Sequence, residues 1–292
     1  MSALVTNVLA QAFITLVAVA GVYVLTGLTG MFSLGQAAFM AIGAYVSGLL
    51  VIRLGLPFAL AALVAVALAV AVGYLIGYPV VRLRRDYISL VTLGFGEAIA
   101  ALLNRMTSLT GGASGLTGVP RYVGLPLALV SAVIVIALVA FFKTSKFGRQ
   151  CIALKDDELA AKAMGIDVTR IKMIAFLLSV AFVSFSGVLY VFYMSYVDPT
   201  GFGWKKSADW VIMVFFGGVN SLTGSTVGAF LLSALPQALR GLQNYRYVIY
   251  AVFVLLILNF KPSGLFGEWE LTPRNVRETL AKLGKKVQKG RE

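Results

Sequence analysis

Long apolar runs, separated by short polar segments, set the pattern of this chain. A helix needs about 20 apolar residues to cross the ~30 Å hydrocarbon layer of a membrane, because each residue adds about 1.5 Å. Each long run therefore predicts a membrane-crossing helix. The runs cover residues 8–28, 31–52, 58–81, 87–103, 123–142 and 171–194.

The apolar region 210–258 is interrupted by glycines. Its pieces 210–216, 226–239 and 248–260 are short or marginal for a full crossing. We expect either three short tilted passes or one re-entrant element there. The predicted fold class is all-α, a polytopic helical membrane protein with about eight spans. Residues 1–265 would form the membrane domain, and residues 266–292 a basic tail.

The location of the charges strengthens this interpretation. Charged residues make up 13% of the chain, against about 25% in globular proteins. Lys and Arg number 25 against 12 Asp and Glu, a balance that in a soluble protein would suggest nucleic-acid binding. However, segments 82–86, 143–172 and 261–292 hold 3, 7 and 8 of these basic residues. Such clustering is typical of cytoplasmic loops, so we expect no nucleic-acid partner.

The basic tail has a pattern of its own. After Thr272 and Pro273, an apolar stripe recurs among Lys and Arg residues, at Val276, Leu280, Leu283 and Val287. This spacing predicts a helix that lies on anionic membrane lipid. A solvated terminus is the alternative.

The sequence excludes several kinds of chemistry within this chain. It contains no His and a single Cys, Cys151. Metal sites of His and Cys, and catalysis by Cys/His or Ser/His/Asp sets, are therefore excluded, and we predict no catalytic residue and no metal ligand. A phosphate-binding Gly-x4-Gly-Lys-Ser/Thr loop is also absent, so no ATP site is predicted here.

Two glycine-containing segments predict breaks in helices at membrane depth. Non-helical backbone is tolerated there only where protein buries it or where it lines a water-filled cavity, and transporters use such breaks to build translocation sites. The alternative is that the glycines only allow close helix packing. The candidate residues are Ser33, Gly35 and Gln36 in the first segment, and Gly217, Gly218, Asn220 and Gly224 in the second.

Glu97 is the only acidic residue inside a predicted span. An ionisable group in hydrocarbon is costly, so we expect Glu97, with Gln36 and Asn104, to line a translocation path. The alternative is a structural acid that bonds a neighbouring helix or pairs with Arg105. The following outward segment, which includes Thr110, Gly111 and Gly112, is rich in Gly and hydroxyl residues and predicts an ordered loop.

The basic segment 143–172 predicts a short helix. Asp156 or Asp157 can cap it, Glu158 lies in its first turn, and Gly165 ends it. A helix of two turns is marginal alone in water. It would therefore lean on a partner protein or pack as a loop helix on its own chain.

Several motifs of the chain resemble those of a known protein family. Residues 158–165, followed by 171–176, resemble the EAA-type cytoplasmic loop of ABC importer permeases. Further motifs occur in the order found in the LivM branch of branched-chain amino acid permeases. They are residues 32–39, 43–45, 110–120, 148–149 and 217–230.

The resemblance implies an ATP-driven importer in a bacterial or archaeal cytoplasmic (inner) membrane, with the C-terminus in the cytoplasm. Its other parts would be two ABC ATPase subunits, which bind ATP and Mg, a second homologous permease, and a periplasmic or lipid-anchored substrate-binding protein. Branched-chain or related hydrophobic amino acids are the expected substrates, and urea, short amides or aromatic acids are the alternatives. An ion-coupled secondary transporter is a less favoured alternative, because such a protein would usually carry several titratable groups in its spans, whereas this chain has Glu97 as the only acidic one. The coupling helix would use Glu158, Ala160, Ala161 and Gly165.

Overall fold

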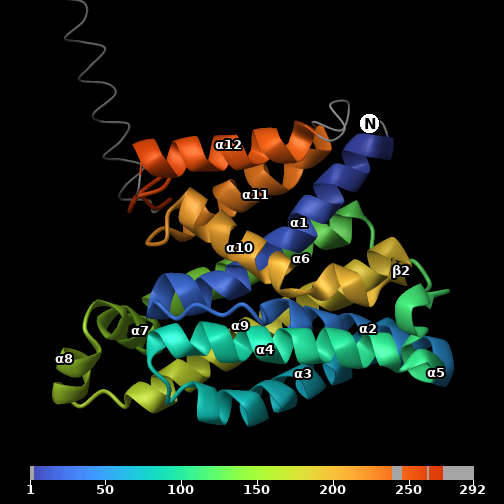
Figure 1. Ribbon diagram of the computed structural model, residues 1–292, viewed down its shortest axis with the longest axis horizontal. Coiled ribbons are helices and arrows are strands. Elements are labelled where there is room, and N and C mark those ends of the chain that lie inside the picture. Colours follow the sequence, from blue (N-terminus) through green and yellow to red (C-terminus); the bar gives the residue numbers. More distant parts are fainter. Residues whose placement is uncertain (1–2, 239–244, 262, 272–292) are drawn as a thin grey trace, which may run out of the picture.

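The chain folds into a bundle of helices, most of which run along its long axis (Figure 1). The computed structural model describes residues 3–238, 245–261 and 263–271. Among these residues, six helices are long and apolar enough to cross a membrane. They are α1 (Ala3–Tyr23, continued by the π-helix η1, Val24–Leu28), α2 (Gln36–Leu54), α3 (Phe58–Val80), α4 (Arg85–Arg105), α6 (Leu125–Thr144) and α9 (Val168–Met194).

The remaining elements are shorter. Helices α5 (Thr107–Thr110), η2 (Gly112–Ser114) and η3 (Pro199–Phe202) lie near a two-stranded antiparallel sheet, in which β1 (Leu116–Thr117) pairs with β2 (Tyr196–Val197). Helices α7 (Lys146–Asp156) and α8 (Glu158–Ala163) lie at the opposite end of the bundle (Figure 1). We call these ends the sheet end and the α8 end.

The core forms where α9 packs against α1, α2 and α3. Helices α1, α2 and α9 are mostly buried, whereas α3, α4 and α6 expose most of their apolar surface. Glycines allow α2 and α9 to approach closely. A Cβ at Gly43 would lie 2.1 Å from the Ser184 carbonyl oxygen, and one at Gly187 would lie 2.0 Å from the Met40 carbonyl oxygen. The apolar surfaces of α3 and α6 suit contact with lipid.

Three short helices complete the bundle: α10 (Trp204–Gly217), α11 (Leu222–Ala238) and α12 (Tyr245–Phe260), of 14, 17 and 16 residues. The turn between α10 and α11 lies at the α8 end, since the Asn220 carbonyl accepts a hydrogen bond from Lys143. The chain after α12 returns there, because the Leu265 amide donates to the Phe216 carbonyl. Helix α12 covers one side of the bundle (Figure 1). Three short passes and one re-entrant element both remain predictions for this region, since none of these three helices is among the six long enough to cross a membrane.

Two predicted boundaries were wrong. The second apolar run predicts a helix from residue 31, but α2 begins at Gln36, because residues 30–35 are not helical. The first piece of the interrupted apolar region predicts a segment from residue 210, but α10 already begins at Trp204. Ser207 is buried there, and its hydroxyl accepts a hydrogen bond from the Ala37 amide at 2.9 Å. The predicted tail helix lies outside the described residues.

Candidate functional site

Local capping explains how the short helix α8 forms. One carboxylate oxygen of Asp157 accepts hydrogen bonds from the amides of Leu159 and Ala160 at 2.8 and 3.0 Å, which confirms the predicted cap. Gly165 follows with φ +80°, a left-handed conformation, and a Cβ at this position would meet nothing within 4 Å. Glycine is thus favoured there by the backbone conformation and not by crowding.

The surface of α8 is unusually apolar for a segment outside the bundle. Leu159 and Met164 are 79% and 84% exposed. Ala160 is also exposed, whereas Ala161 is 4% exposed and faces the protein itself. Ala160 and Ala161, both expected to serve in the coupling helix, therefore do not face outward together, and the large exposed apolar side chains are those of Leu159 and Met164.

Glu158 ties α8 to the protein. Its carboxylate receives a hydrogen bond from the Lys172 ammonium at 2.7 Å, and these side chains are 39% and 3% exposed. Lys172 lies in the first turns of α9. Because loss of the Glu158 carboxylate would leave the Lys172 ammonium buried and unpaired, this ion pair holds α8 onto α9.

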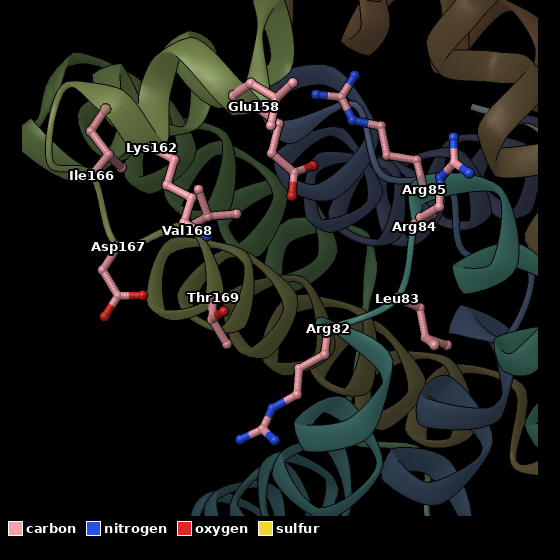
Figure 2. A pocket seen from close by; sticks show the side chains of 11 residues that line it. Arg82, Leu83, Arg84, Arg85, Glu158, Lys162, Ile166, Asp167, Val168 and Thr169 are labelled. Carbon is pink, nitrogen blue, oxygen red and sulfur yellow. The ribbon is translucent and has the colours of Figure 1, made fainter.

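A groove of 710 Å³ separates α8 from the connection between α3 and α4. Figure 2 shows side chains of residues 82–85 on one wall, and those of Glu158, Lys162 and residues 166–169 on the other. Arg82, Arg84 and Arg85 give the first wall a positive charge. This wall is fixed to α7, because the Arg85 guanidinium donates to the carbonyls of Leu154 and Lys155.

The first predicted break is present at residues 29–35, which we call the first break. Hydroxyl groups satisfy much of its backbone. The Leu34 amide donates to Thr92 Oγ1 at 3.2 Å, and Ser89 Oγ donates to the Phe32 carbonyl at 3.0 Å. This is how non-helical backbone is stabilised away from water.

Side chains at the first break are less well satisfied. Ser33 is 1% exposed and Gln36 is fully buried. Neither the Ser33 hydroxyl nor the Gln36 amide group has a hydrogen-bond partner among the described residues. Gln36 therefore lines no open path in this conformation.

The second predicted break comprises residues 218–221, which we call the second break. Helices α10 and α11 meet closely beside it, since a Cβ at Gly217 would lie 2.1 Å from the Gly224 carbonyl oxygen. Gly218 has φ +123°, a conformation that side chains disfavour. The structure thus places Gly217, Gly218, Asn220 and Gly224 together.

Sequence reasoning missed the partners of Asn220. Its carbonyl accepts a hydrogen bond from Lys143 Nζ at 3.0 Å and one from the Tyr23 hydroxyl at 3.3 Å. Its side-chain oxygen accepts one from Lys155 Nζ at 2.5 Å, and Lys143 also pairs with Glu270. We call these five residues the junction.

The junction brings several segments together around a cavity of 300 Å³. Lys155 Nζ also donates to the Gly27 carbonyl at 2.9 Å, so α7 is joined to the end of η1 as well as to the second break. Burial lowers the pKa of Lys155, Asp156 counters this, and the positive charges of Lys143 and Arg85 lower it further. The sequence marks Lys143 and Lys155 as members of a basic segment, but it does not indicate that they bind the carbonyl of Gly27 or the side chain and backbone of Asn220.

Glu97 lies beside the start of α10, and its Oε1 accepts a hydrogen bond from the Trp204 amide at 3.1 Å. This agrees with the alternative in which Glu97 bonds a neighbouring helix. The predicted pair with Arg105 does not form, since the ion pairs recorded in the described part of the chain are Lys143–Glu270 and Lys172–Glu158. Asn104 is exposed near the end of α4 and is not brought together with Glu97 in a pocket.

The outer loop is stabilised locally. Thr110 Oγ1 donates to the carbonyls of Leu103 and Met106 at 2.6 and 2.8 Å and accepts from the Gly112 amide at 3.2 Å. Gly111 has φ +77°, and a Cβ there would lie 2.1 Å from the Gly115 carbonyl oxygen. These contacts give Thr110, Gly111 and Gly112 a structural role in the ordered loop.

Comparisons with known proteins agree with this architecture. A family model described as "Branched-chain amino acid transport system / permease component" matches residues 4–258. The chain is 32% identical over 279 residues to the high-affinity branched-chain amino acid transport system permease protein LivM of Escherichia coli, covering 84% of this chain and 66% of that protein. The chain thus spans slightly less than two thirds of that relative.

Further similarities are weaker in identity. The probable branched-chain amino acid transport permease protein LivM of Methanocaldococcus jannaschii is 24% identical, covering 77% of this chain and 73% of the relative. The LivH permease protein of Escherichia coli is 25% identical, covering 84% and 88%. A solved structure of PsaBC from Streptococcus pneumoniae in complex with Fab has a TM-score of 0.50 and 18% identity, covering 91% of this chain and 94% of that one, and supports the fold alone.

Proposed function

Because the chain belongs to the permease-component family of branched-chain amino acid transport systems, we propose that it is the membrane-spanning subunit of an ATP-driven importer of branched-chain or related hydrophobic amino acids. The family match over residues 4–258 carries this proposal. ATP and Mg would bind to two separate ATPase subunits. An extracytoplasmic binding protein, periplasmic or lipid-anchored, would deliver the substrate.

Charge supports the orientation of the chain in a cytoplasmic (inner) membrane. The α8 end carries Arg82, Arg84 and Arg85 together with the basic residues of α7 and α8. Basic residues are retained in cytoplasmic loops. The α8 end, and the chain beyond α12 that returns to it, would therefore lie in the cytoplasm, and the sheet end outside.

Helix α8 would be the contact with an ATPase subunit. The exposed side chains of Leu159 and Met164 form an apolar contact surface, and buried apolar anchors contribute most of the binding energy at protein interfaces. Glu158 and Gly165 would act indirectly. Glu158 fixes α8 to α9, and the left-handed conformation of Gly165 sets the direction in which the chain leaves α8. Ala160 would border the contact, and Ala161 would support the helix from inside.

The junction would transmit movement of α8 to the translocation path. A displacement of α8 moves α7, and Lys155 joins α7 to both Gly27 and Asn220. Gly27 lies in η1 shortly before the first break, and Asn220 lies in the second break, so α7 contacts the chain near both breaks. The junction thus provides a route that supplements the one through α9.

The exposed surface of α4 is the candidate contact with a second, homologous permease. Its mean hydropathy, 1.4, is the lowest among the six long helices, although most of it is exposed. Glu97, Gly94 and Asn104 lie on this exposed surface, where contact with lipid would be costly. A second permease would cover them and enclose a path.

The test combines co-purification with uptake. Leu159→Glu should place a charge in the proposed contact and reduce both ATPase recovery and leucine uptake by about tenfold or more, as expected for loss of an interface anchor. Leu54→Glu is the matched control, since Leu54 is 68% exposed at the sheet end. Equal ATPase recovery by the Leu159→Glu and wild-type chains would contradict the role of α8.

Substrate identity is tested separately. Uptake of labelled leucine by the assembled importer should be reduced by isoleucine and valine and unaffected by urea or benzoate. Competition by urea or benzoate alone would contradict the amino-acid assignment and favour the other substrates considered above.

A further inference from the structure

The wall of the bundle holds a further pocket, between α4, η3 and the start of α10, with a volume of 470 Å³. We call it the α4–α10 pocket. Four charged residues line it: Glu97, Lys205, Lys206 and Asp209. The lining thus holds two carboxylates and two ammonium groups, and the charge of Asp198 outside the lining also acts on Lys206.

Lys206 is held in an unusual way. Its ammonium lies 4.6 Å from the ring centre of Tyr190, 4.7 Å from that of Phe202 and 6.0 Å from that of Trp210. Aromatic faces attract a cation without accepting a conventional hydrogen bond. In the described part of the chain, Lys206 forms no ion pair within 4.0 Å. Its N–H donors are therefore available to an anionic group that enters the pocket.

The carboxylates of Glu97 and Asp209 are likewise available to bind a cationic group that enters the pocket. Glu97 uses Oε1 to accept a hydrogen bond from the Trp204 amide, and this contact fixes the carboxylate at the edge of the pocket. Neither Glu97 nor Asp209 forms an ion pair among the described residues. The Trp204 side chain is 41% exposed and supplies an apolar surface to the same pocket.

We propose that the α4–α10 pocket is a passage site for the zwitterionic head group of an α-amino acid. The substrate carboxylate meets Lys206, its ammonium meets Glu97 and Asp209, and its apolar side chain lies against Trp204. The inference rests on the proposed function and names the part of the substrate that this chain recognises.

Charge balance selects the ligand class. A zwitterion adds no net charge to the pocket while pairing both signs of charge. A carboxylic acid without an amine leaves the carboxylates of the pocket unpaired, and urea or a neutral amide leaves both the carboxylates and the ammonium groups unpaired. Either ligand therefore makes fewer charge pairs than a zwitterion does. Passage also requires weak binding, which two partly hydrated charge pairs provide.

The pocket is connected to the first break. Ser207, which follows Lys206, accepts the hydrogen bond from the Ala37 amide in the first turn of α2. A movement of the first break therefore moves the start of α10. This places the head-group contacts where a change in the helix break can alter them.

Cysteine protection tests the site in the assembled importer. Thr200 lines the pocket and is exposed, so Thr200→Cys places a thiol in its wall. The single native cysteine, Cys151, is fully buried, and burial raises the pKa of its thiol to about 12, so it gives little background. The rate of maleimide labelling is measured with and without ATP, in the presence of leucine, leucinamide or 4-methylpentanoate.

Leucine should slow labelling, and each analogue should need about a tenfold higher concentration for the same effect, because each lacks one charge pair. Lys206→Met should abolish protection by leucine, and Lys206→Arg should restore part of it. Lys146→Met, an exposed lysine at the α8 end, is the matched control. Equal protection by all three compounds, no protection, or a thiol that never reacts would overturn the proposal.

Two results keep this proposal distinct from the proposed function. If ATPase subunits co-purify and leucine is taken up while leucine gives no protection, only the pocket assignment fails. If neither ATPase recovery nor uptake occurs, the importer assignment fails first.

Discussion

The first and second breaks differ in how their polar groups are satisfied. In the first break, hydroxyl groups of α4 bind the backbone, but the Ser33 hydroxyl and the amide group of Gln36, which begins α2, are buried without partners among the described residues. In the second break, Asn220 is bound by Lys143, Lys155 and Tyr23. Both breaks have glycine-containing sequences, but the first leaves buried polar groups without hydrogen bonds, whereas the second forms a dense hydrogen-bond network.

This difference indicates different roles. Buried polar atoms without partners cost free energy, so a conformation that gives Gln36 partners would be favoured by comparison. A satisfied network instead holds its members in one arrangement. We therefore infer that the first break rearranges during transport, while the second moves as a unit with α7.

The largest expected effect is steric and lies at the first break. In Gly35→Ala, the new Cβ would lie 2.1 Å from the Thr92 carbonyl oxygen, so α2 and α4 must separate. We expect a loss of about 1–3 kcal/mol in stability and loss of uptake. Thermal unfolding in detergent and leucine uptake measure these effects.

Gly94→Ala is the control on α4, since its Cβ would meet nothing within 4 Å. In detergent it should leave the stability of the isolated chain unchanged or raise it by up to about 1 kcal/mol. Only stability is compared, because Gly94 lies on the proposed contact with a second permease. An equal loss of stability in the two variants would show that the first break is not closely packed against α4.

The next effect concerns the bonds of the second break. Asn220→Ala and Lys155→Met each remove the Lys155–Asn220 hydrogen bond, and the double variant should cost less than the sum of the two. We expect an interaction free energy of about 0.5–3 kcal/mol in a double-mutant cycle followed by thermal unfolding. Uptake should fall while ATPase subunits still co-purify. Additive free energies would mean that the junction does not link α7 to the second break.

Gln36→Leu should affect stability and transport in opposite directions. It removes buried polar atoms that lack partners, so stability should be unchanged or raised by about 1 kcal/mol. Uptake should fall if Gln36 binds other groups when the first break rearranges. Ser179→Ala, which removes another unpartnered buried hydroxyl, should leave uptake normal. Destabilisation by Gln36→Leu would indicate that Gln36 is already satisfied in the resting protein.

The smallest expected effect concerns α7, whose Lys155 binds the second break, and tests whether α7 stays packed during turnover. Cys151 lies in α7, and burial raises the pKa of its thiol to about 12 from a usual value near 9. At pH 8 the thiolate is therefore about a thousandfold scarcer than in an exposed cysteine. Because the folded pKa is the higher one, the linked stability is present below about pH 9 and declines toward pH 12. Rapid labelling of Cys151 during turnover would show that α7 opens.

Local signals predicted much of this structure from the sequence. The apolar runs indicated the long helices, and Asp157 and Gly165 marked the ends of α8. The start of α10 was missed because Lys205, Lys206 and Asp209 are typical of a loop, although aromatic rings stabilise Lys206 in a helix. The junction was missed because Lys143 and Lys155 lie 77 and 65 residues from Asn220, a separation that only the fold bridges.

Helix α9 carries contacts that belong to both ends of the bundle. Near one end, Lys172 pairs with Glu158 of α8, and near the other, the ring of Tyr190 faces the ammonium of Lys206. The helix has 27 residues and is therefore about 40 Å long. A straight helix rotates as one body, so a turn of α9 about its axis that was started at α8 would swing the Tyr190 ring relative to Lys206. The strength with which the pocket holds a substrate would then depend on the angle of a single helix.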